Sequence, residues 1–133
     1  MTHKTQIPLA YVRLLNHSLA GSAPESLDDL FAPNACVERY VFGEPPRVHC
    51  GLEQIEESLV RLPPIGGSFH VADVRADGTT VHARFFTRDF AYPMRGIYRF
   101  ELDAQGRVAR LYISAKYTTA PEWGPDLDLP ALT

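Results

Sequence analysis

The sequence has few of the features that define several broad protein classes. Its 133 residues include only two cysteines, Cys36 and Cys50, too few for a disulfide scaffold and without the spacing of a metal site. No apolar run reaches the ~18 to 20 residues that a membrane-spanning helix needs. The best candidate, residues 7–19, lacks a signal-peptide cleavage site and is interrupted by Arg13, Asn16 and His17. We therefore expect a cytoplasmic protein with no membrane partner.

An excess of basic residues is also missing. Thirteen Lys and Arg against sixteen Asp and Glu give a net charge of -3, which argues against a nucleic-acid partner. Residues 75–116 reverse this balance, with eight basic side chains against four acidic ones, and this favours a small anionic ligand. The length fits one domain, which we place at residues 1–117, followed by an irregular Pro-rich tail at residues 118–133.

The two cysteines are expected to be free thiols. If residues 35–42 and 47–50 form a hairpin around a turn at residues 43–46, the partner of Cys50 lies near Arg39, about three residues from Cys36. At ~3.3 Å per residue this offset exceeds the Cα separation that a disulfide tolerates. The sequence therefore predicts no intramolecular disulfide.

The first half of the chain predicts three helices and one hairpin. Apolar residues at helical spacing from Ile7 to Ser18 predict a helix of about 15 residues that Gly21 closes. A short second helix is expected after residues 22–24, with Leu27, Leu30 and Phe31 on one face, and ends at Pro33 and Asn34. Strands are expected at residues 35–42 and 46–50, and a third helix at residues 51–62.

The second half predicts sheet, because the apolar period changes from helical to alternating. Four strands are expected, at residues 68–77, 79–90, 95–103 and 107–117, with tight turns at Asp77-Gly78 and Ala104-Gln105-Gly106. Helices followed by a strand meander predict an α+β fold, with three N-terminal helices packed on one curved antiparallel sheet.

Four stretches carry a resemblance to a known superfamily: Tyr11-Val12-x-x-Leu15-Asn16, residues 30–38, residues 43–55, and the hairpin from Tyr98-Arg99-Phe100 to Gly106-Arg107-Val108. With the order of elements, they resemble the NTF2-like superfamily, in the branch of ketosteroid isomerase and the SnoaL-like polyketide cyclases. The resemblance covers about residues 6–117. It implies a cone around a hydrophobic pocket and a homodimer through the outer sheet face, but no activity by itself, because this fold carries many chemistries.

The resemblance also assigns candidate catalytic residues. Tyr11 matches the oxyanion-binding tyrosine of the isomerases. Arg39 stands where they have the general-base aspartate, and Gly96 is the nearest match to their second oxyanion-hole carboxylate. A guanidinium cannot abstract a proton near neutral pH. Glu38 is a substitute base if a bulge turns it inward, and is otherwise an outward, solvated side chain.

The alternating pattern does not decide which face of strand 79–90 lines the pocket, because both faces of such a sheet can be covered. If this strand turns the same alternate residues inward as the matching strand of the isomerases does, the pocket is cationic. It is then lined by Tyr11, Arg39, His82, Arg84, Phe86, Arg88, Tyr98, Phe100, Leu111 and Ile113. In the other orientation, the two arginines of this strand lie on the outer surface and pair with Asp73, Asp89 or Glu101.

With this pocket, the resemblance implies a SnoaL-like or ketosteroid isomerase-like enzyme. Its expected reaction is cofactor-free proton transfer, such as isomerisation, cyclisation or dehydration, on a small hydrophobic substrate that carries or develops negative charge. Tyr11 is expected to donate a hydrogen bond to oxygen, His82 to move the proton and Arg39 to stabilise the anion. The alternatives are a non-catalytic binder of an acidic metabolite and a dimeric interaction module. No metal is expected. Residues 63–67 are expected to form the pocket rim, and Trp123 to cap the pocket or dock on a partner.

Overall fold

The structure, a computed structural model, describes residues 3–21, 27–60 and 67–118. Two α-helices, two short 3-10 segments and six strands make up these residues. In chain order they are η1 (Lys4–Gln6), α1 (Ile7–Leu19), η2 (Leu27–Asp29), β1 (Phe31–Val41), β2 (Arg47–Cys50), α2 (Leu52–Val60), β3 (Ser68–Asp77), β4 (Thr80–Arg88), β5 (Met94–Leu102) and β6 (Val108–Tyr117).

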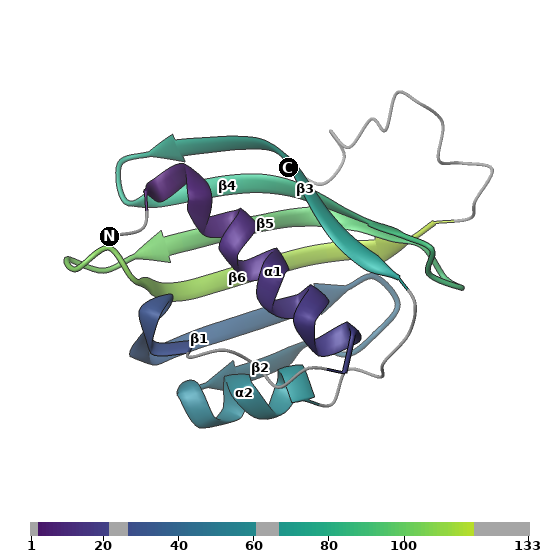
Figure 1. The fold of residues 1–133 in the computed structure, drawn as a ribbon, viewed down its shortest axis with the longest axis horizontal. Coiled ribbons are helices and arrows are strands. Elements are labelled where there is room, and N and C mark those ends of the chain that lie inside the picture. Colours follow the sequence, from purple (N-terminus) through teal and green to yellow (C-terminus); the bar gives the residue numbers. More distant parts are fainter. Residues whose placement is uncertain (1–2, 22–26, 61–66, 119–133) are drawn as a thin grey trace.

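All six strands form one curved sheet in the order β2-β1-β6-β5-β4-β3 (Figure 1). The hairpins β3–β4, β4–β5 and β5–β6 are antiparallel, as the alternation and the turn residues predict. The strand β1 pairs in parallel with β6, so the prediction of a wholly antiparallel sheet is wrong. A parallel pair needs a long connection, and here the whole β2-to-β5 segment supplies it.

One face of the sheet is covered by α1, which lies across the strands (Figure 1). We call this the inner face and the opposite side the outer face. The helix begins with Pro8 in its first turn, where a missing amide hydrogen is tolerated. Its buried side, including Ile7, Val12 and Leu15, packs against inner-face residues such as Phe100 and other members of one hydrophobic core.

The prediction of three N-terminal helices is wrong for the described residues. The expected second helix is only the three-residue turn η2, and Phe31 already begins β1. Pro33 and Asn34 do not end a helix; they lie exposed within β1, where its register with β6 shifts. A shift of this kind leaves residues unpaired, which suits proline because it has no amide hydrogen. The expected start of that helix at residues 22–24 lies outside the described residues.

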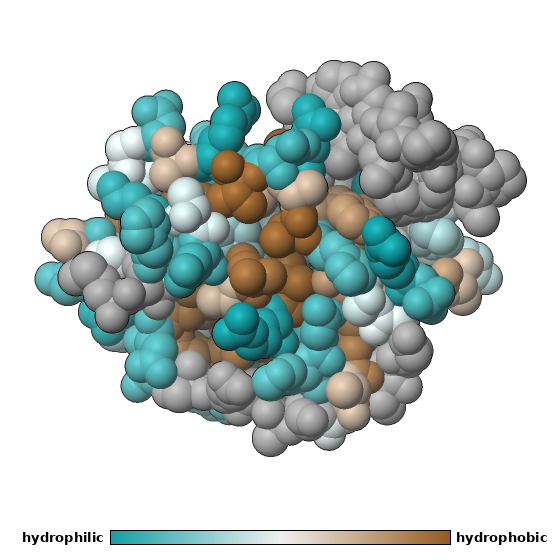
Figure 2. Space-filling model, turned by 45° about the horizontal axis from the view of Figure 1, so that its top comes forward, coloured by the Kyte–Doolittle hydropathy of each residue, from teal (hydrophilic) through white to brown (hydrophobic). Residues whose placement is uncertain are grey.

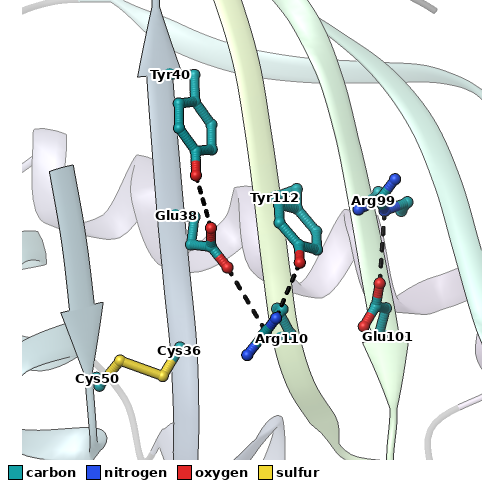
Figure 3. A network of polar contacts seen from close by, with 8 residues as sticks. All are labelled: Cys36, Glu38, Tyr40, Cys50, Arg99, Glu101, Arg110 and Tyr112. Carbon is teal, nitrogen blue, oxygen red and sulfur yellow. Dashed lines mark hydrogen bonds and ion pairs between the residues drawn. A yellow bond between two sulfur atoms is a disulfide. The ribbon is translucent and has the colours of Figure 1, made fainter. Parts of the chain in front are cut away.

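The prediction of free cysteines is also wrong, because Cys36 and Cys50 are joined by a disulfide between β1 and β2 (Figure 3). The two residues are direct cross-strand partners, with Cα atoms 4.1 Å apart. The predicted hairpin was three residues out of register. Its real connection is wide, since Tyr40 and Val41 pair with β6 and are not part of the β1–β2 ladder.

No helix in residues 3–21, 27–60 or 67–118 is long and apolar enough to cross a membrane. Residues 63–66 of the expected pocket rim and residues 119–133 of the expected tail, with Trp123, lie outside the described part of the chain.

Candidate functional site

Strand β4 divides its side chains cleanly between the two faces of the sheet. Val81, Ala83, Phe85 and Thr87 are all buried, whereas the residues between them are half-buried or exposed. Phe85 belongs to the hydrophobic core beneath α1. The odd-numbered residues of β4 therefore face inward, which is the opposite of the orientation that the resemblance to the isomerases implies.

The inner face carries a pocket of about 360 Å³ between α1, the strand ends and the segment after β4. Its size is within the range of small-molecule sites. Figure 2 shows apolar side chains gathered in the middle of the α1 side, with hydrophilic ones around them. The pocket is lined by Tyr11, Leu15, Leu19, Arg39, Phe69, Phe85, Phe90, Ala91, Tyr92, Met94, Tyr98, Ile113 and Tyr117. Seven of these residues are aromatic, so the pocket favours a flat, apolar ligand.

Four candidate residues from the sequence come together in this pocket: Tyr11, Arg39, Tyr98 and Ile113. Tyr11 projects from α1, and its ring meets Tyr98 edge to face, with the ring centroids 5.3 Å apart. Tyr98 in turn stacks on Phe85, with centroids 4.4 Å apart and nearly parallel planes. These contacts fix both tyrosine rings in position through the packing of the core.

Both tyrosines are acids that burial makes weaker. Removal from water raises the pKa of Tyr11 to about 12, and the nearby positive charge of Arg39 acts in the opposite direction. Burial also raises the pKa of Tyr98 well above its usual value, with a further increase from Tyr11 and an opposing effect of Arg39. Near neutral pH both hydroxyls are therefore protonated and can donate hydrogen bonds.

Arg39 is the one charged side chain among the described residues that line this pocket. It lies on the inner side of β1, opposite Ile113 of β6, and is half-buried. Within the described ranges, no protein group hydrogen-bonds or pairs with its guanidinium or with the hydroxyls of Tyr11 and Tyr98. Buried polar groups usually have hydrogen-bond partners. The guanidinium and the two hydroxyls are therefore able to donate hydrogen bonds to an oxygen atom of a ligand.

Some residues that line the pocket were not predicted from the sequence. Phe69 is held in place by Asn16 of α1, whose side-chain amide donates to the Phe69 carbonyl (3.0 Å) and accepts from the Phe69 amide (2.7 Å). This pair satisfies backbone groups of the edge strand β3. Tyr92 and Tyr117 are 77% and 47% exposed and lie at the pocket mouth. Of these residues, only Tyr117 could have been predicted from the sequence, because it continues the alternating set of β6 residues that face inward.

Gly96 lies on the inner face, but there is no room for a side chain there. A Cβ atom at this position would lie 2.6 Å from the Phe85 ring and would also collide with the carbonyl oxygen of Ser114. The space that a carboxylate would need is therefore filled by Phe85 and the backbone of β6. Phe100 and Leu111 also face inward, but they are wholly buried in the core and do not line the pocket.

The other candidates do not share the pocket with Tyr11. The prediction that His82, Arg84, Phe86 and Arg88 line it is wrong, because all four alternate with the buried residues of β4 and lie on the outer face. Arg84 forms an ion pair with Asp73 (3.5 Å), as the alternative orientation predicts. His82, the expected proton-transfer residue, is therefore on the opposite side of the sheet from Tyr11.

Glu38 also lies on the outer face and not in the pocket. Its carboxylate accepts a hydrogen bond from Tyr40 (2.6 Å) and pairs with Arg110 (3.5 Å), which donates to the Tyr112 hydroxyl (Figure 3). A bulge that turns Glu38 inward is absent, since Glu38 is in regular register with Tyr112. Glu38 is thus not a base for the inner pocket.

A second, larger hollow of about 720 Å³ lies on the outer face, and His82 and Arg84 are among the residues that line it. Among the described residues, no three His, Cys, Asp or Glu side chains are grouped so that they could hold a metal ion.

Comparison with solved structures identifies the fold. A proposed polyketide cyclase from Sinorhizobium meliloti is 23% identical, with a TM-score of 0.60 over 81% of this chain and 93% of that one. A proposed ketosteroid isomerase from Kribbella flavida is 16% identical (TM-score 0.61; 98% and 87%). An NTF2-like protein of unknown function from Cytophaga hutchinsonii is 12% identical (TM-score 0.61; 93% and 97%). The fold is NTF2-like.

At these identities the likeness shows the fold alone. No family model matches the sequence, and no curated protein matches it either. The expected resemblance in fold is confirmed, and the activity has to be inferred from the residues of the NTF2-like pocket.

Proposed function

We propose that the inner pocket binds a small, flat, largely apolar molecule with an anionic oxygen. The observation that carries this proposal is the position of Arg39, the single charged residue in the described lining, beside two protonated tyrosines without protein partners. A guanidinium in apolar surroundings binds a carboxylate or enolate oxygen strongly, because little water competes for its hydrogen bonds.

The aromatic lining supports the remainder of the ligand. Rings from β3, β4, β5 and the segment after β4 surround the space next to Arg39. Such walls favour a ring system over a flexible chain, since rings stack at little cost in conformational entropy. The best candidate for the function is therefore a binding site for an aromatic or polycyclic acid.

A matched pair of probes tests this proposal. 2-Naphthoate and 2-naphthamide have the same ring and nearly the same shape, but only the first is charged. We expect naphthoate to bind more tightly to the native chain by isothermal titration calorimetry. In Arg39→Gln this preference should vanish, because the charge has no partner. Equal affinity of both probes for the native chain would reject the proposal, and so would an unchanged preference in Arg39→Gln.

A second candidate is the cofactor-free isomerase or cyclase chemistry that the sequence suggests. It is favoured by the raised pKa of Tyr11, which keeps the phenol a hydrogen-bond donor to an oxyanion that develops during reaction. The described pocket lining contains no carboxylate or imidazole, so none of these lining residues supplies a general base. Binding is the better-supported function for this reason.

The enzymatic candidate has its own test. Exchange of the α-protons of 2-tetralone with deuterated water, followed by NMR, measures enolate formation in the pocket. If the chain is an enzyme of this kind, it accelerates the exchange, and Tyr11→Phe slows it by about 100-fold or more, the usual effect of losing one oxyanion donor. Exchange at the uncatalysed rate would leave binding as the function.

The homodimer implied by the resemblance stays a prediction. Sedimentation velocity of the native chain measures it directly.

A further inference from the structure

The outer face of the sheet carries a surplus of positive charge. Seven basic side chains lie on this face of the described strands, against four carboxylates. The basic residues are Arg75, Arg84, Arg88, Arg95, Arg99, Arg110 and Lys116, and the acidic ones are Glu38, Asp73, Asp77 and Glu101. The surplus attracts anions to this side of the molecule, although the net charge of the whole chain is -3.

The arginines gather at one end of the outer groove. Arg75 of β3 lies opposite His82 of β4, which lies opposite Arg99 of β5. Since neighbouring strands are about 4.8 Å apart, Arg75 and Arg99 start about 10 Å from one another. Arg84 lies two residues along β4 on the same face and also lines the groove. Three long cationic side chains from three strands can thus meet over one small anion.

Their present partners leave much of this charge available. Arg84 and Asp73 are 3.5 Å apart, and Arg99 lies 3.6 Å from Glu101. Pairs as long and as exposed as these contribute little energy. Arg75 has no carboxylate partner in the described ranges. Each guanidinium has five N–H donors, so one such ion pair leaves most of them able to bind a ligand.

Directly beside Arg99, on β6 and β1, the groove offers aromatic surface. Tyr112 lies beneath the guanidinium of Arg99 (4.1 Å to the ring centroid) and accepts a hydrogen bond from Arg110 (2.9 Å). Tyr40 is fixed by its hydrogen bond to Glu38 (Figure 3). Ile97 and Ser114 complete the lining between the tyrosines and Arg84. These fixed rings provide a surface for a planar group.

We propose that this groove is a second binding site, for a small phosphorylated molecule with a planar ring. A phosphate monoester carries three terminal oxygens and up to two charges, which suits guanidinium groups that approach from three directions. The ring then lies toward Tyr40 and Tyr112. The volume of about 720 Å³ is enough for such a ligand.

Charge favours this ligand over a second copy of the chain. A two-fold contact between two outer faces would bury two surfaces that each carry a surplus of positive charge. Like charges held face to face oppose association, unless an anion lies between them. A small dianion neutralises the arginine end without such repulsion.

Three probes separate the parts of the proposed ligand: adenosine monophosphate, adenosine and inorganic phosphate. We expect saturable binding of the monophosphate by calorimetry, with the other two at least 10-fold weaker. In NMR spectra its addition should shift amide signals of β4, β5 and β6 around the groove. No saturable binding of the monophosphate would overturn the proposal, and binding that is equal for inorganic phosphate would remove the planar ring from it.

Variants locate the site. Arg84→Gln and Arg99→Gln should each weaken the monophosphate at least 10-fold. Lys116→Gln, on the same face but outside the lining of this groove, and Arg39→Gln, in the inner pocket, should leave its affinity unchanged. An equal loss in Lys116→Gln would show general attraction to the surface and reject the site. A native dimer by sedimentation that Arg99→Glu dissociates would also reject it, because a second copy would then cover the groove.

Discussion

The two faces of the sheet use the same types of residue for different purposes. On the inner face, Arg39 is a single charge among aromatic rings, and the core fixes its tyrosine neighbours. On the outer face, arginines lie in rows and interact with exposed carboxylates and with Tyr112. The comparison shows that surroundings, more than residue type, decide what a side chain does. A lone charge in apolar surroundings selects one ligand atom, whereas a row of charges selects a highly charged ligand.

The largest difference in stability is expected between substitutions at two adjacent residues of β4. Phe85 is 1% exposed and stacks on Tyr98, whereas Phe86 is on the outer face beside His70. Phe85→Ala should lower the free energy of unfolding by about 3 to 5 kcal/mol because it leaves a cavity in the core. Phe86→Ala, the matched control, should cost about 1 kcal/mol or less. Urea denaturation measures both, and equal losses would show that the faces are not distinct.

The disulfide should be the strongest contribution on the outer side. It closes a loop with a sequence separation of 14, so its reduction should lower the free energy of unfolding by about 3 kcal/mol. Urea denaturation with and without a reducing agent measures this loss. The double variant Cys36→Ala, Cys50→Ala provides the control, because a reductant should not affect it. Stability that does not respond to reductant in the native chain would contradict the prediction.

The buried tyrosines make the inner face sensitive to high pH. The pKa of Tyr11 is about 12 in the folded chain and about 10 in the unfolded chain. Its contribution to the free energy of unfolding is therefore complete below pH 10 and is lost as the pH rises toward 12. At 1.36 kcal/mol per pKa unit, the loss is about 2 to 3 kcal/mol. Tyr11→Phe should remove part of this slope in urea denaturation at pH 9 to 11. Tyr92→Phe, at the exposed mouth, is the matched control, and an identical slope in Tyr11→Phe would disprove the assignment.

The missing side chain of Gly96 tests how tightly the inner face is packed. Gly96→Ala places a methyl group against Phe85 and the backbone of β6, so we expect a loss of about 1 to 3 kcal/mol from overpacking. Ser114→Ala, on the neighbouring strand and the other face, should change thermal stability little. A neutral Gly96→Ala would mean that the sheet relaxes easily around this position.

The smallest effect is expected for the outer network around Glu38. Glu38→Gln breaks the ion pair with Arg110 and keeps the shape of the side chain. We expect a loss below about 1 kcal/mol in urea denaturation, because ion pairs near the surface contribute little. Glu101→Gln, whose ion pair with Arg99 is equally exposed on both sides, is the control. A loss of several kcal/mol would place Glu38 in a strongly coupled network instead.

The sequence by itself determined the local structure wherever the spacing of apolar residues was compatible with only one arrangement. Helical spacing placed α1, and alternation with turn residues placed β3 to β6 within a few residues. The resemblance to the NTF2-like superfamily also implied that Tyr11 and Arg39 share one pocket, and both line the inner pocket. The NTF2-like fold was predictable from the order of elements.

Only the tertiary structure decided which face of β4 is buried, because Phe85 and Phe86 are equally apolar and alternation has two solutions. The packing of α1 chose Phe85, and so moved His82 and Arg84 away from the pocket. Similarly, the disulfide depends on a strand register that is set by long-range pairing of β1 with β6 and not by the turn residues. Local pattern fixes which residues alternate, and only contacts between distant segments fix where each side chain points.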